Sequence, residues 1–326
     1  MPTINPEATP LFSVIIPVYN GSNYMKEAID SALNQGYENV EVIVVNDGST
    51  DNGQTEEIAL SYGSRIRYFS KPNGGVSIAL NFGISKMLGT YFCWLSHDDI
   101  FGGDRIMDDW QVLSANPSAK VIFCRSAVID PRGNVKGINQ YPITEIKSPY
   151  DAMVLGGVNL CCMTIHRSCL QLPDPFNTEN KTTQDVEFSI FLARKYEFFY
   201  NPRSVVFIRK HPQQGTRTQK KQHAVDTLAL SRKIQNTMGV DDFFPGLDKS
   251  DHHAQYLAWS KLGRVYGNCF RDYTYSLACY AKACTHEKRF FSVANLICLL
   301  GPRFYKEPFV RFPLFILRFL KKMFQR

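Results

Sequence analysis

The sequence lacks long apolar runs, and no stretch approaches the roughly 20 residues that a membrane-spanning helix needs. Residues 1–6 have neither the basic region nor the long apolar region of a secretory signal, so we expect a cytoplasmic protein. The nine cysteines are odd in number and show no metal-binding spacing. We therefore expect them to be reduced and mostly buried, in an ordinary globular protein.

An excess of positive charge is almost absent outside one segment. The net charge is +7, but residues 301–326 hold seven Lys or Arg against one acid, so most of the excess lies there. A nucleic-acid-binding protein would instead spread a basic stripe across the face of a domain. The near neutrality of the first 300 residues therefore excludes nucleic acid as an expected partner.

What the sequence does contain, between residues 12 and 124, is an alternation of short β-rich runs with helical periodicity. This alternation predicts an α/β fold with a mostly parallel sheet and helices on both faces. Ligands bind such sheets at the carboxyl ends of the strands, where four of the runs are followed by polar or glycine-rich residues. The predicted strands are 12–18, 40–45, 65–69, 89–95 and 120–124, and the polar segments are 19–21, 46–51, 71–75 and 97–99.

Beyond about residue 220 the β-rich runs stop and the pattern becomes helical. We expect a first domain of residues 1–220 and a helical C-terminal region of residues 221–326, ending in a basic amphipathic tail at about 301–326. Two interpretations of this tail stay open. It contacts an anionic membrane surface on the cytoplasmic side as a peripheral element, or it packs on the protein with a solvated basic edge.

Two adjacent carboxylates, Asp98 and Asp99, end the apolar run 89–95 and its short continuation. Hard divalent cations such as Mg²⁺ or Mn²⁺ bind through one or two protein carboxylates together with the oxygens of a substrate diphosphate. The pair therefore indicates a nucleotide site. The alternative is a helix cap or a solvated turn, which is common for Asp after a strand.

Five motifs in order resemble the family 2 glycosyltransferases over roughly residues 12–215. The resemblance implies a GT-A fold, which is Rossmann-like, with the C-terminal helical region as an addition. It also implies an inverting transfer from a nucleotide-diphosphate sugar. The motifs are VIIPVYN (14–20), VVNDGSTD (44–51), NGGVS (73–77), NFGI (81–84) and DD (98–99).

The resemblance implies that Asp47 contacts the uracil edge of the donor, although a capping role in its own turn is equally typical of the sequence. After the last predicted strand, a basic loop resembles the segment that closes over the donor, and its cations would neutralise the diphosphate. The residues expected to bind the nucleotide sugar are Pro17, Val18, Tyr19, Asn20, Asp47, Asn73, Gly74, Asp98, Arg209 and Arg217.

The same resemblance implies a Mn²⁺ or Mg²⁺ cofactor held by Asp98 and Asp99, with His211 as a nitrogen ligand. Ser96 stands where the family has the first acid of its metal-binding motif, and Leu80 stands where many relatives carry an arginine. A solvated histidine in a basic loop is the ordinary alternative for His211.

Inversion at an anomeric carbon requires a base on the face opposite the leaving group. The family places this carboxylate in an acidic pair that opens a helix, and the matching position is Asp185, with Gln184 in place of the first acid and Glu187 as the substitute. The alternative is that Asp185 only complements the dipole of its helix.

We therefore expect an inverting hexosyl- or N-acetylhexosaminyl-transferase. It would move a sugar, with UDP as the predicted carrier, to a hydroxyl of a glycan or lipid-linked acceptor in surface polysaccharide synthesis. One rival is a non-catalytic relative that binds nucleotide or glycan in a complex. The other is a nucleotidyltransferase, which would need a cationic loop after the first strand, and residues 20–23 contain no Lys or Arg.

Overall fold

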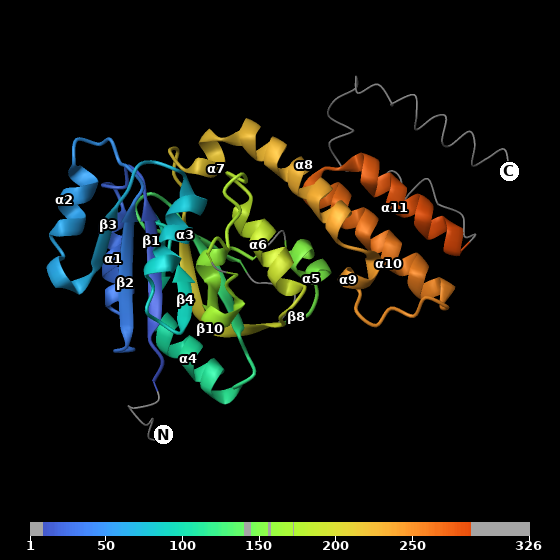
Figure 1. Ribbon diagram of the computed structural model, residues 1–326, viewed down its shortest axis with the longest axis horizontal. Coiled ribbons are helices and arrows are strands. Elements are labelled where there is room, and N and C mark those ends of the chain that lie inside the picture. Colours follow the sequence, from blue (N-terminus) through green and yellow to red (C-terminus); the bar gives the residue numbers. More distant parts are fainter. Residues whose placement is uncertain (1–8, 140–144, 156–157, 172, 288–326) are drawn as a thin grey trace. The chain divides into compact units, whose positions relative to one another are not determined.

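The computed structural model describes residues 9–139, 145–155, 158–171 and 173–287 (Figure 1). Its contacts divide the chain into two compact units, residues 1–247 and 248–326. In the described ranges no helix is long and apolar enough to cross a membrane. The basic tail at 301–326 lies outside the described residues, so its contact with a membrane stays a prediction.

A ten-stranded mixed sheet forms the centre of the first unit. Eight strands follow the order β3-β2-β1-β4-β9-β6-β10-β5, while β7 pairs with β6 and β8 pairs with β10. The block from β3 to β4 is entirely parallel, as are β6 and β10, while β9 runs antiparallel between β4 and β6. The strands are β1 (Phe12–Val18), β2 (Val40–Asn46), β3 (Arg67–Ser70), β4 (Tyr91–Trp94), β5 (Ile100–Gly102), β6 (Val121–Ile129), β7 (Val135–Asn139), β8 (Glu145–Ile146), β9 (Met163–His166) and β10 (Phe198–Arg209).

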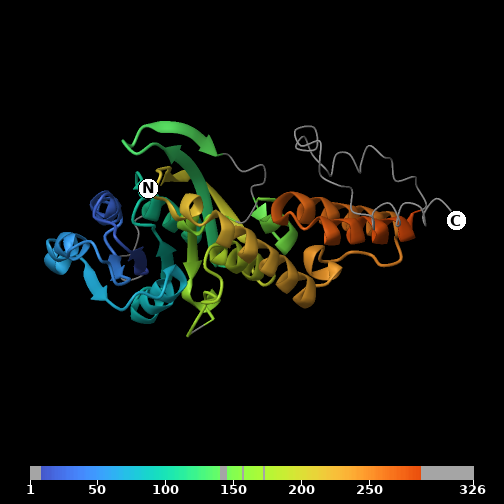
Figure 2. The ribbon, with the colours of Figure 1, turned by 90° about the horizontal axis from the view of Figure 1, so that it is seen from above.

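Helices cover both faces of this sheet, as the alternation predicts. The chain moves from β1 to β2 and on to β3 in one direction, then returns across the sheet to β4. Right-handed crossovers therefore place α1 (Met25–Leu33) and α2 (Gln54–Leu60) on one face and α3 (Val76–Lys86) on the other, which Figures 1 and 2 show. Every residue of β1 is buried, which explains its continuous apolar sequence.

The described residues from 220 to 287 are mostly helical, as the sequence predicts. The first unit ends with α8 and α9, and the second contains α10 and α11, joined by a short π-helical segment. The division of the chain at residue 220 stays a prediction. The remaining helices are α4 (Arg105–Ala115), α5 (Pro149–Val154), α6 (Gln184–Ala193), α7 (Gly215–Thr218), α8 (Lys220–Thr237), α9 (Val240–Phe243), α10 (His252–Val265) and α11 (Tyr273–His286).

A charged network lies fully buried where α4 packs on the sheet. The Asp109 carboxylate accepts hydrogen bonds from Thr164 Oγ1 at 2.7 Å and Asn201 Nδ2 at 2.8 Å, and Arg105 lies 3.7 Å away. Burial lowers the pKa of the Arg105 guanidinium, but the Asp109 carboxylate together with Cys93 and Cys124 raises it overall. The network joins α4 to β9 and to the irregular middle of β10.

Removing the carboxylate of Asp109 is expected to be costly, because it leaves the Arg105 charge buried without a partner. We expect Asp109→Ala to lower the free energy of unfolding by about 3–5 kcal/mol. The matched control is Asp108→Ala, whose carboxylate is part-exposed and lies 3.8 Å from Arg203. It should cost less than about 1 kcal/mol. Urea titrations measure both, and equal midpoints for the two variants would contradict the role of the network.

Candidate active site

Asp47 closes the turn that follows β2, and its carboxylate is held from three sides. Lys71 Nζ lies 2.5 Å from Oδ1, the Gly74 amide donates to Oδ1 at 3.0 Å, and the Gly75 amide donates to Oδ2 at 2.7 Å. The side chain therefore caps the start of α3. The capping alternative predicted bonds within its own turn, whereas the structure shows bonds to the loop after β3.

Two glycines let the loops after β2 and β3 approach each other this closely. Gly48 has a φ of +70°, and a Cβ there would come within 2.6 Å of the Asn73 amide nitrogen. Gly75 has a φ of +88°, which a residue with a Cβ rarely adopts. Asn73 Nδ2 donates to the Asp47 carbonyl at 2.9 Å. Asn73, Gly74 and Asp47 thus form one continuous rim.

The loop after β1 joins the same rim. Asn20 has a φ of +50°, a conformation that Asn tolerates better than most residues, and its Oδ1 accepts from the Thr50 amide at 2.7 Å. Pro17 and Val18 are buried in β1, whereas Tyr19 is 46% exposed. The Tyr19 ring is therefore open to solvent, and contact of Pro17, Val18 and Tyr19 with a nucleotide stays a prediction.

Asp98 and His211 meet at the opposite end of this edge. His211 Nε2 lies 2.9 Å from Asp98 Oδ2, and both side chains are almost fully buried. This distance is that of a hydrogen bond, and the expected role of the pair as metal ligands stays a prediction. In the described ranges no three His, Cys, Asp or Glu side chains are grouped to hold an ion. The pair would therefore need oxygen atoms from a substrate.

The Asp99 carboxylate bonds to the backbone at the end of β10. Its Oδ1 accepts from the Arg209 backbone amide at 2.9 Å, and the side chain is buried. Burial and the Asp98 carboxylate raise the pKa of Asp99 well above its usual range. These contacts favour a role in holding the strand end, and the expected role of Asp99 as a metal ligand stays a prediction.

The buried guanidinium of Arg209 makes its hydrogen bonds to groups of the protein itself. It donates to the Asp98 carbonyl at 3.0 Å, to the Pro131 carbonyl at 3.1 Å and to Glu27 Oε2 at 2.8 Å. The same group stacks on the Tyr24 ring, 4.4 Å from its centroid. Only 1% of the side chain is exposed. These contacts favour a positioning role over direct contact with a diphosphate.

Arg217 is an exposed residue of the short helix α7.

Tyr24 contacts the His211 ring as well as Arg209, and the centroids of the two rings are 5.0 Å apart. Tyr24 and Glu27 were missed by the sequence interpretation. They are separated from Arg209 by more than 180 residues and carry no motif of their own.

Asp185 occupies the first turn of α6, as predicted. Its Oδ1 accepts from the Val186 amide at 2.8 Å. Burial raises the pKa of Asp185, and the backbone amides and the charge of His223 offset this only in part. The hydrogen bond from Val186 uses one carboxylate oxygen, and the expected role of Asp185 as the base stays a prediction.

Glu187, the substitute base, is fully engaged. Asn180 Nδ2 donates to Oε2 at 2.7 Å, Asn177 Nδ2 lies 3.2 Å from both oxygens, and Lys233 Nζ lies 2.5 Å from Oε1. The carboxylate ties α6 to α8 and to the loop before α6. Its contacts favour Asp185 as the base.

Helix α3 anchors the loop that leads to α6. Asn81, from the NFGI motif, accepts from the Phe176 amide at 3.0 Å and donates to the Phe176 carbonyl at 2.8 Å. Ser77 Oγ donates to the Asn180 carbonyl at 3.3 Å. The helix that Asp47 caps is therefore the helix that fixes the approach to Asp185.

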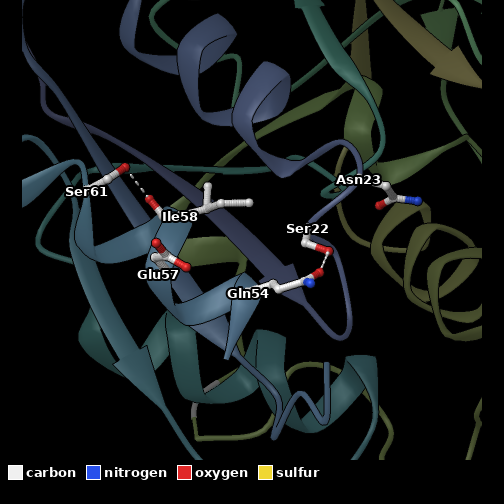
Figure 3. Close-up of a pocket in the computed structure, with 6 residues that line it drawn as sticks. All are labelled: Ser22, Asn23, Gln54, Glu57, Ile58 and Ser61. Carbon is white, nitrogen blue, oxygen red and sulfur yellow. Dashed lines mark hydrogen bonds between the residues drawn. The ribbon is translucent and has the colours of Figure 1, made fainter. Parts of the chain in front are cut away.

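A surface groove of about 460 Å³ lies between the start of α1 and α2 (Figure 3). Ser22 Oγ donates to Gln54 Oε1 across it at 3.2 Å. At its edge, Asn23 Nδ2 lies 3.4 Å from Gln213 Oε1, two residues after His211. The groove adjoins the loop after β1 but contains none of the predicted site residues.

Comparison with known proteins places these residues in a family. Residues 13–171 match the model of glycosyl transferase family 2. An uncharacterized glycosyltransferase of Rickettsia typhi is 39% identical over 215 residues, which are 64% of this chain and 67% of that protein. A Rickettsia felis glycosyltransferase is 41% identical over 213 residues, 64% of this chain but 35% of its own length. Chondroitin synthase of Pasteurella multocida is 29% identical over 257 residues, 76% of this chain and 26% of that protein. The chain thus spans about a third of the R. felis relative.

Two solved structures resemble the chain in fold. Residues 1–349 of TarS from S. aureus, in complex with UDP-GlcNAc, give a TM-score of 0.56 at 17% identity, covering 85% of this chain and 90% of TarS 1–349. A mannosyltransferase from Pyrobaculum calidifontis, with GDP-Man and Mn²⁺, gives 0.54 at 15% identity, covering 91% and 80%. The expected GT-A fold is confirmed.

The raised pKa of Asp185 makes a prediction about stability. Because burial penalises the ionised form, the folded protein loses stability as pH rises from 3.8, the ordinary pKa, through the folded-state pKa. We expect Asp185→Asn to raise the melting temperature at pH 7, by an increment that shrinks as pH falls toward 3.8.

The control variant, Asp226→Asn, should change the melting temperature at pH 7 in the opposite direction. Burial raises the pKa of Asp226, but hydrogen bonds from the Thr182 and Gln222 side chains and from the Lys181 and Thr182 amides together lower it. Its stabilisation is therefore present at pH 7 and is lost as pH falls through its folded-state pKa. Asp226→Asn should therefore lower the melting temperature at pH 7. Calorimetry of both variants at several pH values checks this, and a melting temperature lowered by Asp185→Asn at pH 7 would contradict it.

Proposed function

The chain belongs to glycosyl transferase family 2, and we propose that it is an inverting enzyme that moves a sugar from UDP to a hydroxyl of a glycan or lipid-linked acceptor. The observation that carries the proposal is a set of three groups: a rim around Asp47, the Asp98–His211 pair after the strands β4 and β10, and Asp185 in the first turn of α6, whose preceding loop is bonded to α3. Under the proposal, the rim binds the nucleotide, the Asp98–His211 pair holds the ion that stabilises the diphosphate charge, and Asp185 removes the proton.

The rim around Asp47 supports a nucleotide base, because a carboxylate accepts the base N–H while exposed Tyr19 offers a ring for stacking. The solved structure of TarS contains UDP-GlcNAc, which makes UDP the favoured carrier. An N-acetylhexosaminyl or hexosyl donor is proposed on the same ground.

Asp98 and His211 would hold the divalent cation, with diphosphate oxygens as its further ligands. The imidazole favours a transition ion such as Mn²⁺ over Mg²⁺, and the similar mannosyltransferase was solved with Mn²⁺. When bound, the ion supplies positive charge that stabilises the departing diphosphate. Arg209 and Tyr24 hold the pair in place.

Asp185 would remove the proton from the attacking hydroxyl. Its raised pKa brings a carboxylate closer to the working pH, and this improves general base catalysis. The loop anchored on α3 and the α6–α8 bridge through Glu187 keep its helix start fixed.

The acceptor is proposed to be a growing surface polysaccharide, a role supported by the similarity to chondroitin synthase. A non-catalytic relative is the alternative that the departures at residues 80, 96 and 184 favour. We propose instead that the Asp98–His211 pair takes the role of the acid that Ser96 replaces. Ser96 Oγ instead lies 3.3 Å from Cys161 Sγ.

Metal binding tests the first part of the proposal. With UDP present, Mn²⁺ should bind at least about 10-fold more weakly to His211→Ala and Asp98→Ala than to the wild type, because each removes a direct ligand. Asp30→Ala, an exposed carboxylate on α1, is the control. Electron paramagnetic resonance of free Mn²⁺ measures the affinity. Unchanged affinity in both site variants would rule out the assignment.

Sugar transfer tests the second part. A panel of nucleotide sugars identifies the donor, and NMR of the product shows whether the anomeric configuration inverts. Asp185→Asn should keep UDP binding but lower transfer by about 10²-fold or more. Wild-type activity should fall at acid pH with a midpoint above 3.8, because the base must be ionised.

Glu187→Gln is the matched comparison, since it neutralises a carboxylate in the same helix turn. It should lower the melting temperature while keeping most of the transfer rate. If Glu187→Gln abolishes transfer in a folded protein and Asp185→Asn does not, the base is Glu187.

A further inference from the structure

We propose that Lys71 reads the nucleobase together with Asp47, donating a hydrogen bond to a uracil carbonyl beside the N–H that Asp47 accepts. The proposal rests on the proposed function, since it takes UDP as the carrier. It assigns a binding role to a residue that lies next to the NGGVS motif and outside all the expected site residues.

Lys71 is fixed at the correct edge of the sheet. It directly follows β3, and its backbone amide donates to the Asn46 carbonyl at 3.0 Å. Its Nζ lies 2.5 Å from both Asp47 Oδ1 and the Pro72 carbonyl. The Lys71 side chain is 14% exposed and that of Asp47 is 5% exposed. The ammonium group is therefore held beside Asp47.

Both partners keep one unused hydrogen-bonding position. An ammonium group has three donors, and Asp47 and Pro72 take two of them. Each carboxylate oxygen can accept about two bonds. Asp47 Oδ2 has one close donor, the Gly75 amide at 2.7 Å, since the Gly74 amide is nearer to Oδ1. The pair therefore offers one donor and one acceptor side by side.

Uracil presents the complementary pattern, because its N3–H lies between two carbonyl oxygens. A base that places N3–H on Asp47 Oδ2 puts a carbonyl next to that contact, where the free Lys71 donor can reach it. The pair is neutral in sum, which suits an uncharged base better than a phosphate. Charge-assisted bonds of this kind are the stronger ones.

Helix α3 brings no competing cation to this place. Leu80 is fully buried against the core, and the basic residue of the helix, Lys86, lies in its last turn. Lys86 instead contacts the rings of Phe69 and Phe82. The positive charge beside Asp47 is therefore supplied by the strand end rather than by the helix.

The test compares UDP with 2-thio-UDP and 4-thio-UDP, because sulfur is a much weaker hydrogen-bond acceptor than oxygen. Calorimetry on the wild type should show that one of the two replacements weakens binding several-fold. Lys71→Met should weaken UDP binding by about 10-fold. In that variant the thio nucleotide should bind as well as UDP, since the donor that distinguishes them is gone.

Lys26→Met is the matched control, because the Lys26 side chain is 71% exposed on α1. It should keep both the affinity for UDP and the thio penalty. If Lys71→Met does not fold, Lys71→Gln keeps a neutral donor beside Asp47, and it should reduce the thio penalty.

Three results would overturn the proposal. The first is a wild type that binds all three nucleotides equally. The second is a thio penalty that is unchanged in the Lys71 variants, which would mean that Lys71 only neutralises Asp47 or contacts the diphosphate. The third is a wild type that does not bind UDP. That result is obtained before any variant is compared, and it identifies a failure of the proposed donor itself.

Discussion

The site depends on the hydrogen bonds that the buried guanidinium of Arg209 makes. A buried Arg must find partners for its N–H groups, and here those partners come from three separate places: the turn at Asp98, the loop at Pro131 and helix α1 at Glu27. Its backbone amide also holds Asp99. The end of β10 is therefore joined to the end of β4, and His211 follows two residues later.

The carboxylates of the edge differ in how much of their bonding capacity the fold uses. Glu187 is saturated by two amides and a lysine, so it is a structural group. Asp99 is buried next to another acid and bonded to the backbone. Asp185 bonds to the backbone amide of Val186, and Asp98 bonds to the imidazole of His211. Environment rather than residue type thus separates the groups that can do chemistry from those that hold the structure.

Much of the first half of the sheet could be predicted, because buried parallel strands carry continuous apolar runs. The predicted first strand coincides with β1 at both ends. The predicted fifth strand stopped at residue 124, whereas β6 continues to Ile129 through polar Arg125 and Ser126. Short antiparallel strands such as β9 and β5 were not predicted, since a few residues give no periodicity.

The expected site residues came from the resemblance, and the contacts between them could not have come from local patterns. Arg209 and Glu27 are 182 residues apart, and Asn81 and Phe176 are 95 apart. Lys71 begins the polar segment 71–75 of the sequence, but only the fold shows that its ammonium group reaches Asp47. Pairings of this length depend on the topology of the sheet.

The replacement at residue 96 has a consequence for the order of binding. A third carboxylate beside Asp98 and Asp99 would add charge where the pKa of Asp99 is already raised by burial and by Asp98. Ser96 is turned to Cys161, and the groups proposed to hold the ion are the Asp98 carboxylate and the His211 imidazole. An octahedral cation needs six ligands, so most must come from the diphosphate and water. Such a site holds a free ion weakly, and under the proposed function the metal and the nucleotide sugar therefore bind as a unit.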